Sequence, residues 1–259
     1  MIDSKVIKEI ELIYQRRSVL DKFGMEVPLN SEIDSREGQS IIEILQSNPN
    51  FINTVEVGCG MGLSSLYISS VTSTRANSKH TIIDPFQTSH WRSLGLLNLE
   101  RAGISDFELI EEKSEIALPG LLSEGRKYDF ALIDGWHTFD HTLLDFFYLE
   151  KMIRPGGIIA IDDVMMPGIN KAVRYILNYP NIELVSIVPF LQKNRMMKRD
   201  KYLKMMIKPF QFFLPKKYHT RIFSNKILSL DEELNLFASL VFLRKKYEDN
   251  RPWNWYENF

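Results

Sequence analysis

The sequence has almost no cysteine and no long apolar run. Cys59 is the single cysteine among 259 residues, so an internal disulfide is excluded and a reducing compartment is favoured. No run of about 18 apolar residues occurs, so no membrane-spanning helix is predicted. The first residues, MIDSKVIKEIELIYQRR, lack the apolar segment and small-residue cleavage site of a secretory signal. We therefore expect a cytoplasmic protein.

Net charge is also nearly absent, because 32 Lys and Arg residues are balanced by 33 Asp and Glu residues. The balance is uneven along the chain. Residues 191–226 contain eleven Lys and Arg residues and one acid, Asp200, so the remainder carries a clear negative excess. The composition is otherwise that of an ordinary globular protein, and the length suffices for one large domain with a buried core.

Short β-rich runs alternate with helical periodicities from residue 54 onward. This alternation predicts βαβ units with right-handed crossovers, and the continuous apolar strands are typical of a parallel sheet covered on both faces. The predicted strands are residues 54–57, 79–83, 107–110, 128–133, 158–161, 182–188 and 238–244. The predicted helices between them are residues 64–70, 91–102, 115–123, 142–153 and 169–177. We expect the last strand to pair antiparallel near residues 182–188.

Two amphipathic helices are predicted ahead of the first strand, at residues 4–23, stopped by Gly24, and at residues 35–46, capped by Ser35. The fold class is therefore α/β, a single doubly wound domain with a mainly parallel seven-stranded sheet. Its parts are N-terminal helices in 1–50, a ligand-binding core in 51–189, a basic insertion in 190–236, and the last strand with an aromatic tail in 237–259. The tail could dock on the domain or cover a partner.

A glycine-rich turn, V-E-V-G-C-G-M-G, follows the first strand at residues 55–62. Glycine lets a backbone turn sharply and approach a ligand closely, and ligands of doubly wound sheets bind at the carboxyl ends of the strands. The dinucleotide fingerprint fails because residue 63 is leucine. Glu56 could pair with the ammonium of an amino-acid ligand and would repel a pyrophosphate. A tight turn that holds no ligand is the alternative.

Acidic residues close the fourth and fifth predicted strands. Asp134 ends one, and Asp162 with Asp163 ends the other, so three carboxylates are expected at one edge of the sheet. Unpaired like charges raise one another's pKa, and a hard divalent cation such as Mg²⁺ resolves this repulsion. The alternative is that these residues cap a turn and the following helix without an ion.

His137 lies three residues after Asp134 and is the candidate general base. A neutral imidazole is suited to taking a proton near pH 7. A packing or surface histidine is the alternative. Together with His141, four residues on, it could also suggest a two-histidine, one-carboxylate iron site. We discount that site because His137 is expected to precede the helix, so that the two rings need not share a face.

The turn at residues 56–62 resembles motif I of class I S-adenosylmethionine (SAM)-dependent methyltransferases. Three further segments resemble the cation-dependent O-methyltransferases, which include catechol, caffeoyl-coenzyme-A and macrolide-sugar enzymes. These segments are S-R-E-G-Q at 35–39, Y-D-F-A-L-I-D at 128–134 and G-G-I-I-A-I-D-D at 156–163. The adjacent acids at 162 and 163 match the macrolide-sugar group, because the catechol and caffeoyl enzymes commonly carry Asn at the second of these positions. The resemblance covers about residues 35–188.

The resemblance implies two sites. Glycines of the turn would line the methionine moiety of SAM, Asp84 would accept hydrogen bonds from its ribose, and Phe86 would cover its adenine. The residues implied or expected in cofactor binding are Glu56, Gly58, Gly60, Gly62, Asp84, Phe86, Lys113 and Ser114. The residues implied for Mg²⁺ are Asp134, Asp162 and Asp163, and those for catalysis are His137 and Asp134.

The expected function is Mg²⁺-assisted O-methylation of a hydroxyl on a sugar or other small polyol. Two alternatives remain open at this point. One is a metal-free methyltransferase acting on nitrogen or oxygen of a small molecule, and the other is a non-catalytic scaffold that binds an anionic partner or membrane. An iron oxygenase is a third and less favoured alternative.

The basic insertion allows several partners. It could be a lid that meets an anionic group of a small-molecule or glycan substrate carrying phosphate, which is the interpretation we favour. It could instead touch an anionic membrane through residues 191–226, form a dimer contact, or be a solvated helical face. Nucleic acid is not expected, because no binding module accompanies the charge.

Overall fold

The computed structural model of the chain describes residues 1–30, 33–191, 195–215, 218–223 and 225–257. Its centre is a seven-stranded sheet in the order β5-β4-β3-β6-β7-β9-β8. The strands are β3 (Asn53–Val57), β4 (Lys79–Ile83), β5 (Phe107–Ile110), β6 (Tyr128–Ile133), β7 (Ile153–Ile161), β8 (Ile182–Pro189) and β9 (Ala238–Lys245). The neighbours from β5 to β7 pair in parallel, whereas β9 lies between β7 and β8 and is antiparallel to both. The predicted mainly parallel, seven-stranded sheet is confirmed.

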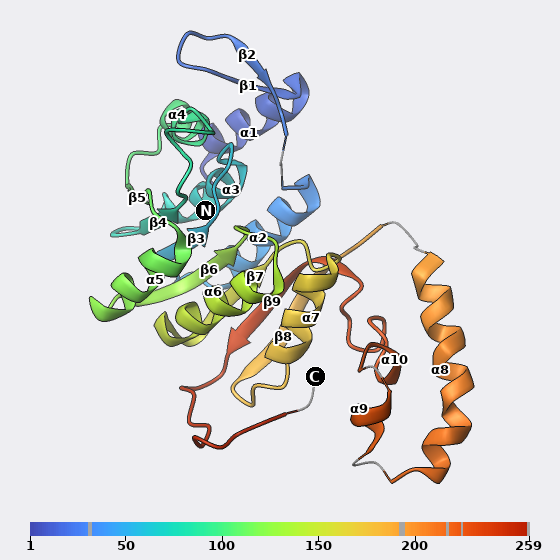
Figure 1. The fold of residues 1–259 in the computed structure, drawn as a ribbon. Helices are drawn as coiled ribbons and strands as arrows, with labels where there is room; N and C mark the ends of the chain where they lie inside the picture. Colours follow the sequence, from blue (N-terminus) through green and yellow to red (C-terminus); the bar gives the residue numbers. More distant parts are fainter. Residues whose placement is uncertain (31–32, 192–194, 216–217, 224, 258–259) are drawn as a thin grey trace.

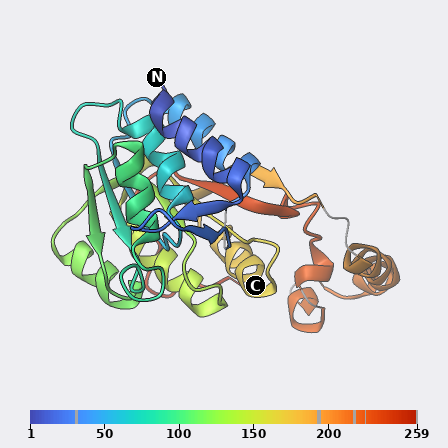
Figure 2. The same cartoon turned by 90° about the horizontal axis from the view of Figure 1, so that it is seen from above.

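Two layers of helices cover the sheet, one on each face (Figures 1 and 2). Side chains alternate along a strand, so Phe130 of β6 lies in the core beneath one layer and Ala131 in the core beneath the other. Burial on both faces is why the central strands are apolar throughout. The first layer holds α1 (Ser4–Arg16), α2 (Ser35–Ser47), α3 (Leu63–Thr72) and α4 (Leu94–Ala102), and the second holds α5 (Ser114–Ser123), α6 (Phe139–Met152) and α7 (Pro167–Ile176).

The first helix is shorter than predicted. It ends at Arg16 rather than at residue 23, because Arg17 takes the left-handed conformation with φ 55°. The chain then forms a hairpin of β1 (Ser18–Leu20) and β2 (Glu26–Pro28), in which Val19 pairs with Val27. Gly24, with φ 80°, belongs to the turn of this hairpin and is not the predicted helix stop.

The second helix begins where predicted, but its cap is Asp34 and not Ser35. The Asp34 side chain accepts the N–H of Arg36 at 2.6 Å, and the Glu37 carboxylate accepts the N–H of Asp34 at 2.7 Å. The Asp34 side chain also accepts the backbone N–H of Glu37, so Asp34 and Glu37 form a reciprocal capping box. The Arg36 side chain also donates to the carbonyl of Pro189 at 3.1 Å. The start of α2 is thereby held against the end of β8.

The basic insertion leaves the sheet at the end of β8 and returns at β9, and we call residues 190–237 the basic lobe. Its described residues include α8 (Arg195–Phe213), α9 (His219–Ile222) and α10 (Asn225–Leu228). Figures 1 and 2 show these helices apart from the sheet, beyond the edge formed by β8. The antiparallel pairing of β9 with β8 confirms the predicted place of the last strand. Within the described residues, no helix has both the length and the apolar character that a membrane span needs.

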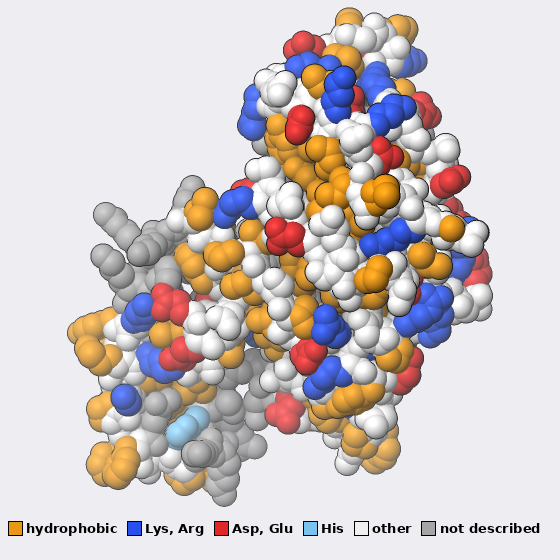
Figure 3. Space-filling view, turned by 180° about the vertical axis from the view of Figure 1, so that it is seen from behind, with side chains coloured by type: hydrophobic (Ala, Val, Ile, Leu, Met, Phe, Trp, Pro, Cys, Tyr) orange, Lys and Arg blue, Asp and Glu red, His pale blue; other side chains and the backbone are white. Residues whose placement is uncertain are grey.

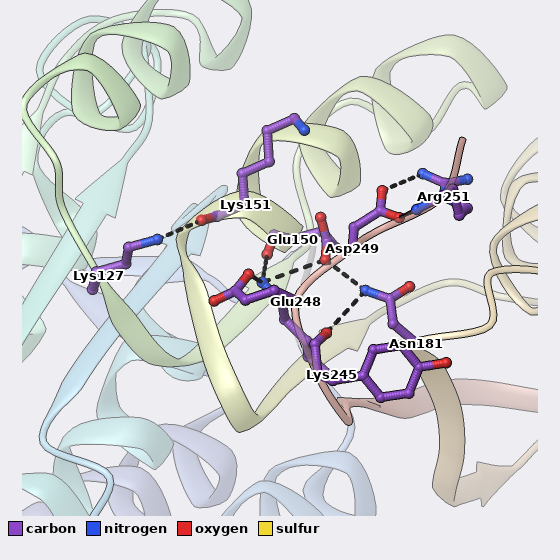
Figure 4. A network of polar contacts seen from close by, with 9 residues as sticks. Lys127, Glu150, Lys151, Asn181, Lys245, Glu248, Asp249 and Arg251 are labelled. Carbon is purple, nitrogen blue, oxygen red and sulfur yellow. Dashed lines mark hydrogen bonds and ion pairs between the residues drawn. The ribbon is translucent and has the colours of Figure 1, made fainter. Parts of the chain in front are cut away.

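A buried cation fixes the end of β9 to α6 (Figure 4). Lys245 is fully buried, and its ammonium donates to the carbonyl of Glu150 at 2.8 Å and to the carboxylate of Glu248. The side chain of Asn181 donates to the Glu150 carboxylate at 2.8 Å. A buried charge is tolerated only when it is paired and hydrogen-bonded, so these contacts anchor the strand at this end.

The described part of the aromatic tail docks on the domain, which is one of the two alternatives that the sequence left open. The Arg251 guanidinium lies 3.4 Å from the ring centroid of Tyr179. The Trp255 ring meets the Tyr179 ring at 5.5 Å in an edge-on arrangement. These contacts hold the described part of the tail near the end of α7.

Candidate active site

The register of the sheet brings the ends of four strands to one edge. Val57 pairs with both Ile83 and Ile133, and Ile133 pairs with Ile161. The residues that follow these strand ends are Gly58, Asp84, Asp134 and Asp162. The predicted convergence of the glycine turn and the acidic residues on one edge is therefore confirmed.

Gly58 allows two loops of this edge to touch. Its φ is +88°, and a Cβ at this position would lie 2.0 Å from the carbonyl oxygen of Asp134. Only glycine fits, because any side chain would drive the two backbones apart. The N–H of Asp134 in turn donates to the carbonyl of Val57 at 2.8 Å. The loop after β3 thus rests directly on the loop after β6.

Whereas Gly58 allows two loops to touch, Gly62 allows two helices to pack closely. Its φ is +83°, and a Cβ would lie 2.7 Å from the carbonyl oxygen of Gly95 in α4. The residue lets α3 start close against α4 and does not line the cavity described below. The structure therefore places Gly62 away from the ligand contact that the resemblance implied.

The Asp84 carboxylate joins the glycine turn to the end of β4. One of its oxygens accepts the N–H groups of Cys59 at 3.2 Å and Gly60 at 3.0 Å, and the other accepts the N–H of Phe86 at 2.9 Å. Gln87, which is fully buried, donates its amide to Asp84 at 2.9 Å and to the carbonyl of Gly60 at 2.8 Å. No motif marks Gln87 in the sequence, so its positioning role was missed.

A cavity of about 840 Å³ opens over this edge of the sheet. Its walls come from the loops that follow β3, β4, β5 and β6 and from the start of α6. A volume of this size suits a small-molecule or cofactor site. The sequence-predicted residues that line the cavity are Gly58, Gly60, Asp84, Phe86, Lys113, Ser114, Asp134 and His137.

Aromatic side chains form much of the remaining wall. Phe86 and Trp136 are 41% and 63% exposed, and both line the cavity together with Trp91. The indole of Trp91 lies 3.7 Å from the place that a Cβ at Gly60 would take. Large flat apolar surfaces are therefore presented to a ligand on both sides of the glycine turn.

Glu56 does not line the cavity. Its carboxylate is completely buried beneath α3, where it accepts the hydroxyl of Ser65 and lies 3.3 Å from Nε2 of His80. Direct pairing of this acid with a ligand is therefore not seen. The Oε2 atom, however, has no hydrogen-bond partner among the described residues. A buried carboxylate oxygen without a donor is costly, so one acceptor position remains available there.

Asp134, His137 and Asp163 bring their polar atoms together. Nε2 of His137 lies 3.4 Å from the carboxylates of both Asp134 and Asp163. One ligand atom from each of the three residues falls within 4.8 Å of the others, which is compatible with a shared cation. Asp163 reaches this place from the left-handed conformation, with φ 55°, which Asp adopts more readily than most residues.

Asp162 is not part of this group, contrary to the predicted set of three aspartates. It is buried, and burial together with the neighbouring carboxylates of Glu37 and Asp163 raises its pKa well above the ordinary value. Burial, followed by the charges of Asp162 and Asp163, also raises the pKa of Asp134. Glu37, whose own pKa is raised by burial, is a fourth acid at this edge that the sequence pattern did not single out.

One expectation finds no support in this arrangement. The described part of the basic lobe contributes no residue to the cavity wall, so the predicted lid does not cover it here. His141 lies outside the group around His137, as expected from its place in α6, and its Nδ1 instead meets the Thr138 hydroxyl at 2.9 Å.

Asp145 is a buried acid of α6 whose side chain is hydrogen-bonded to Ser114 in the cavity wall. It lies one turn after His141 in α6 and is 1% exposed. Burial raises its pKa to about 6, against a smaller opposing effect of its hydrogen bond with the Ser114 hydroxyl. Its Oδ1 atom has no hydrogen-bond partner among the described residues. Burial therefore disfavours the ionised form of Asp145, which keeps its proton up to about pH 6.

The architecture is similar to that of solved methyltransferases, and part of the chain matches a methyltransferase family model. Residues 55–164 match a family model described as a methyltransferase domain. An O-methyltransferase from Bacillus cereus in complex with SAH is similar over 71% of this chain and 84% of its own, with 16% identity and a TM-score of 0.55. No curated protein sequence matches the chain.

Two further solved structures show the same similarity. The O-methyltransferase TomG from Streptomyces achromogenes, involved in tomaymycin synthesis and in complex with SAM, is 15% identical over 72% of this chain and 83% of its own, with a TM-score of 0.55. The SAH-bound methyltransferase PaMTH1 from Podospora anserina is 15% identical over 73% of this chain and 85% of its own, with a TM-score of 0.55. At these identities the likeness establishes the fold.

Replacing Asp145 by Asn should change how stability depends on pH. A carboxyl group with a folded-state pKa of about 6 stabilises the fold below its unfolded value of 3.8, and this contribution is lost as the pH rises through 6. The loss amounts to at most about 3 kcal/mol. Between about pH 4.5 and 7.5, the free energy of unfolding of Asp145→Asn should therefore rise relative to wild type, as measured by urea denaturation. Asp140→Asn, on the same helix but exposed, should show no such rise, and an equal response of the two variants would contradict the assignment.

Proposed function

We propose that this chain, a class I SAM-dependent methyltransferase by its fold and its family match, transfers the methyl group of SAM to a hydroxyl of a small neutral sugar or similar polyol. The observation that carries the proposal is a single cavity that joins the glycine turn and Asp84 to Asp134 and His137. A site for a cofactor and a site for acid–base chemistry thereby share one space.

The cofactor half of the cavity fits SAM. Gly58 and Gly60 leave the backbone bare on the cavity side, and Asp84 with Phe86 stands at the end of the neighbouring strand. Glu56 lies outside the cavity wall, but its buried carboxylate adds negative potential behind the turn. When bound, SAM supplies an activated methyl group on a positively charged sulfonium. The excess of acids at this edge of the sheet favours such a cation.

The acidic group fits a divalent cation. Asp134 and Asp163 offer carboxylate oxygens, which are the ligands that Mg²⁺ prefers, and their mutual repulsion would be relieved by a positive charge. A bound cation would orient two acceptor oxygens and lower the pKa of the attacking hydroxyl. Asp162 and Glu37 lie behind this pair and add negative potential.

His137 is placed to receive the proton of the acceptor. Its ring lines the cavity, about a third exposed, and its Nε2 faces the two aspartates at 3.4 Å. These carboxylates hold the imidazole in place and stabilise it once it is protonated. The acceptor hydroxyl would give its proton to the imidazole nitrogen of His137 that does not face the carboxylates, while its oxygen would gain the methyl group and the sulfonium would become a neutral thioether. Holding the reacting groups in one cavity supplies the orientation that such a displacement needs.

The cavity wall favours a neutral acceptor. Trp136 stands at the mouth beside His137, where an indole can cover the apolar face of a sugar ring while its N–H donates a hydrogen bond. Among the lining residues that the structure describes, Lys113 is the cation, whereas Asp84, Glu115 and Asp134 are acids. A phosphate inside this cavity would be repelled, so any phosphate of the acceptor would lie outside it.

Replacing His137 by Gln should slow methyl transfer without weakening SAM binding. Glutamine keeps much of the size and polarity of the ring but cannot take a proton, and general-base removal typically costs about 10²- to 10⁴-fold in kcat. We would measure transfer from methyl-labelled SAM to a panel of sugars and nucleotide sugars, with and without Mg²⁺, and SAM affinity by calorimetry.

The matched control is His90→Gln, which changes a histidine of the same cavity outside the acidic group. It should retain most of the wild-type kcat. Full turnover in His137→Gln would refute the base assignment. If a much higher Mg²⁺ concentration restores the turnover of His137→Gln, His137 is a ligand of the cation and not the base.

Replacing Asp134 by Asn should stabilise the metal-free protein and abolish its response to Mg²⁺. Burial and neighbouring carboxylates raise the pKa of Asp134, so removing its charge relieves repulsion. In chelator, with SAM present, the melting temperature should rise by about 2–4 °C. Added Mg²⁺ should stabilise wild type but not Asp134→Asn. The control is Glu115→Gln, which changes an acid of the cavity wall outside the group of Asp134, His137 and Asp163 and should be stabilised as wild type is. Equal stabilisation of all three proteins would rule out the metal role, and no response in any would favour a metal-free enzyme.

A further inference from the structure

The basic lobe stands apart from the cavity and has its own interior. On α8, Asp200 is buried and Leu203 and Ile207 are partly buried. Lys201 pairs with Glu232 at 2.6 Å, and Lys204 pairs with Glu233. These contacts bind one side of α8 to the segment between α10 and β9, so that the opposite side of the helix faces outward.

The outward side of α8 is apolar. Its side chains recur at positions i, i+3, i+4, i+8 and i+11, which places them on one stripe of a helix. Each is more than half exposed: Tyr202 57%, Met205 64%, Met206 52%, Phe210 63% and Phe213 82%. A surface helix normally turns such a stripe toward the core, so a contiguous exposed stripe marks an interaction surface.

Positive charge accompanies this stripe. Lys208 is exposed, and Arg199, which pairs with Asp200 at 3.3 Å, keeps 63% of its side chain exposed. The segment 191–226 as a whole carries eleven Lys and Arg residues against one acid. Figure 3 shows the lobe at lower left, with hydrophobic side chains along its outer edge and Lys and Arg side chains beside them.

The exposed apolar stripe and the positive charge together indicate which kind of partner binds this surface. A second copy of the chain, related by a two-fold axis, would bring the same cations face to face, which is unfavourable. An anionic lipid surface satisfies both properties, because its acyl boundary accepts Phe, Tyr and Met side chains and its headgroups attract Lys and Arg. We propose that α8 docks the protein on the surface of anionic membranes through the stripe Tyr202, Met205, Met206, Phe210 and Phe213.

The docking is peripheral and independent of methyl transfer. No helix within the described ranges could span a bilayer. The stripe lies outside the residues that line the cavity, so its loss leaves the cavity wall intact. The basic lobe leaves and rejoins the sheet at the end of β8 and the start of β9, the same edge to which β7 delivers Asp163. Membrane docking would therefore hold the site edge of the sheet near the lipid surface.

The test is sedimentation of the full chain with vesicles of phosphatidylcholine alone or with about 30% phosphatidylserine, a content that makes the surface strongly negative. Wild type should bind the anionic vesicles, and binding should weaken as salt is raised. Phe210→Ser/Phe213→Ser should reduce the partition coefficient by about tenfold or more, and Lys208→Glu should reduce it as well.

The matched control is Phe23→Ser/Met25→Ser, which removes two equally exposed apolar side chains from the hairpin of β1 and β2. It should bind vesicles as wild type does. All variants should keep the wild-type melting temperature, because the changed side chains are exposed. Absence of binding to anionic vesicles would overturn the proposal. So would a dimer in sedimentation velocity that the Phe210→Ser/Phe213→Ser change dissociates, since the stripe would then be covered by a second copy.

Discussion

The close approach of two backbone loops at Gly58 is the constraint on which the site depends. Without a side chain at this position, the turn after β3 can rest on the carbonyl of Asp134. Parallel pairing of β3 with β6 brings the two loops to the same edge, and the absent Cβ lets them meet there. The same contact that opens a bare backbone surface to a cofactor therefore fixes Asp134 beside it. The proposed cofactor site and the proposed acid–base site are therefore coupled by one steric contact.

Around this contact the fold holds more negative charge than it can neutralise itself. Asp134, Asp162 and Glu37 all have raised pKa values, with burial as the first cause. Such an arrangement costs stability and is typical of functional sites rather than of packing. Asp84 has a different environment. Four N–H groups donate hydrogen bonds to its carboxylate, which holds the glycine turn in place.

The sheet and the position of the site could be predicted because the signals were local: apolar strands, each closed by a glycine or an acid, alternate with helices. Other features depend on partners distant in sequence. The predicted N-terminal helix is too long, because the hairpin that follows it is revealed only by the pairing of Val19 with Val27. Gln87 carries no motif, and its role appears only when β4 lies beside the glycine turn. Glu56 was expected in the cavity, but the alternation of side chains along β3 turns it toward His80.

The most direct test of the account is SAM binding by calorimetry to wild type, Gly58→Ala and Gly120→Ala. Gly120 lies in α5 with nothing within 4 Å of an added Cβ, so its replacement should be harmless. We predict one SAM site per chain in wild type and in Gly120→Ala, and affinity lowered about tenfold or more in Gly58→Ala, because the added methyl group must separate the two loops. Equal affinity of Gly58→Ala and wild type would contradict the account, as would a wild-type protein that does not bind SAM.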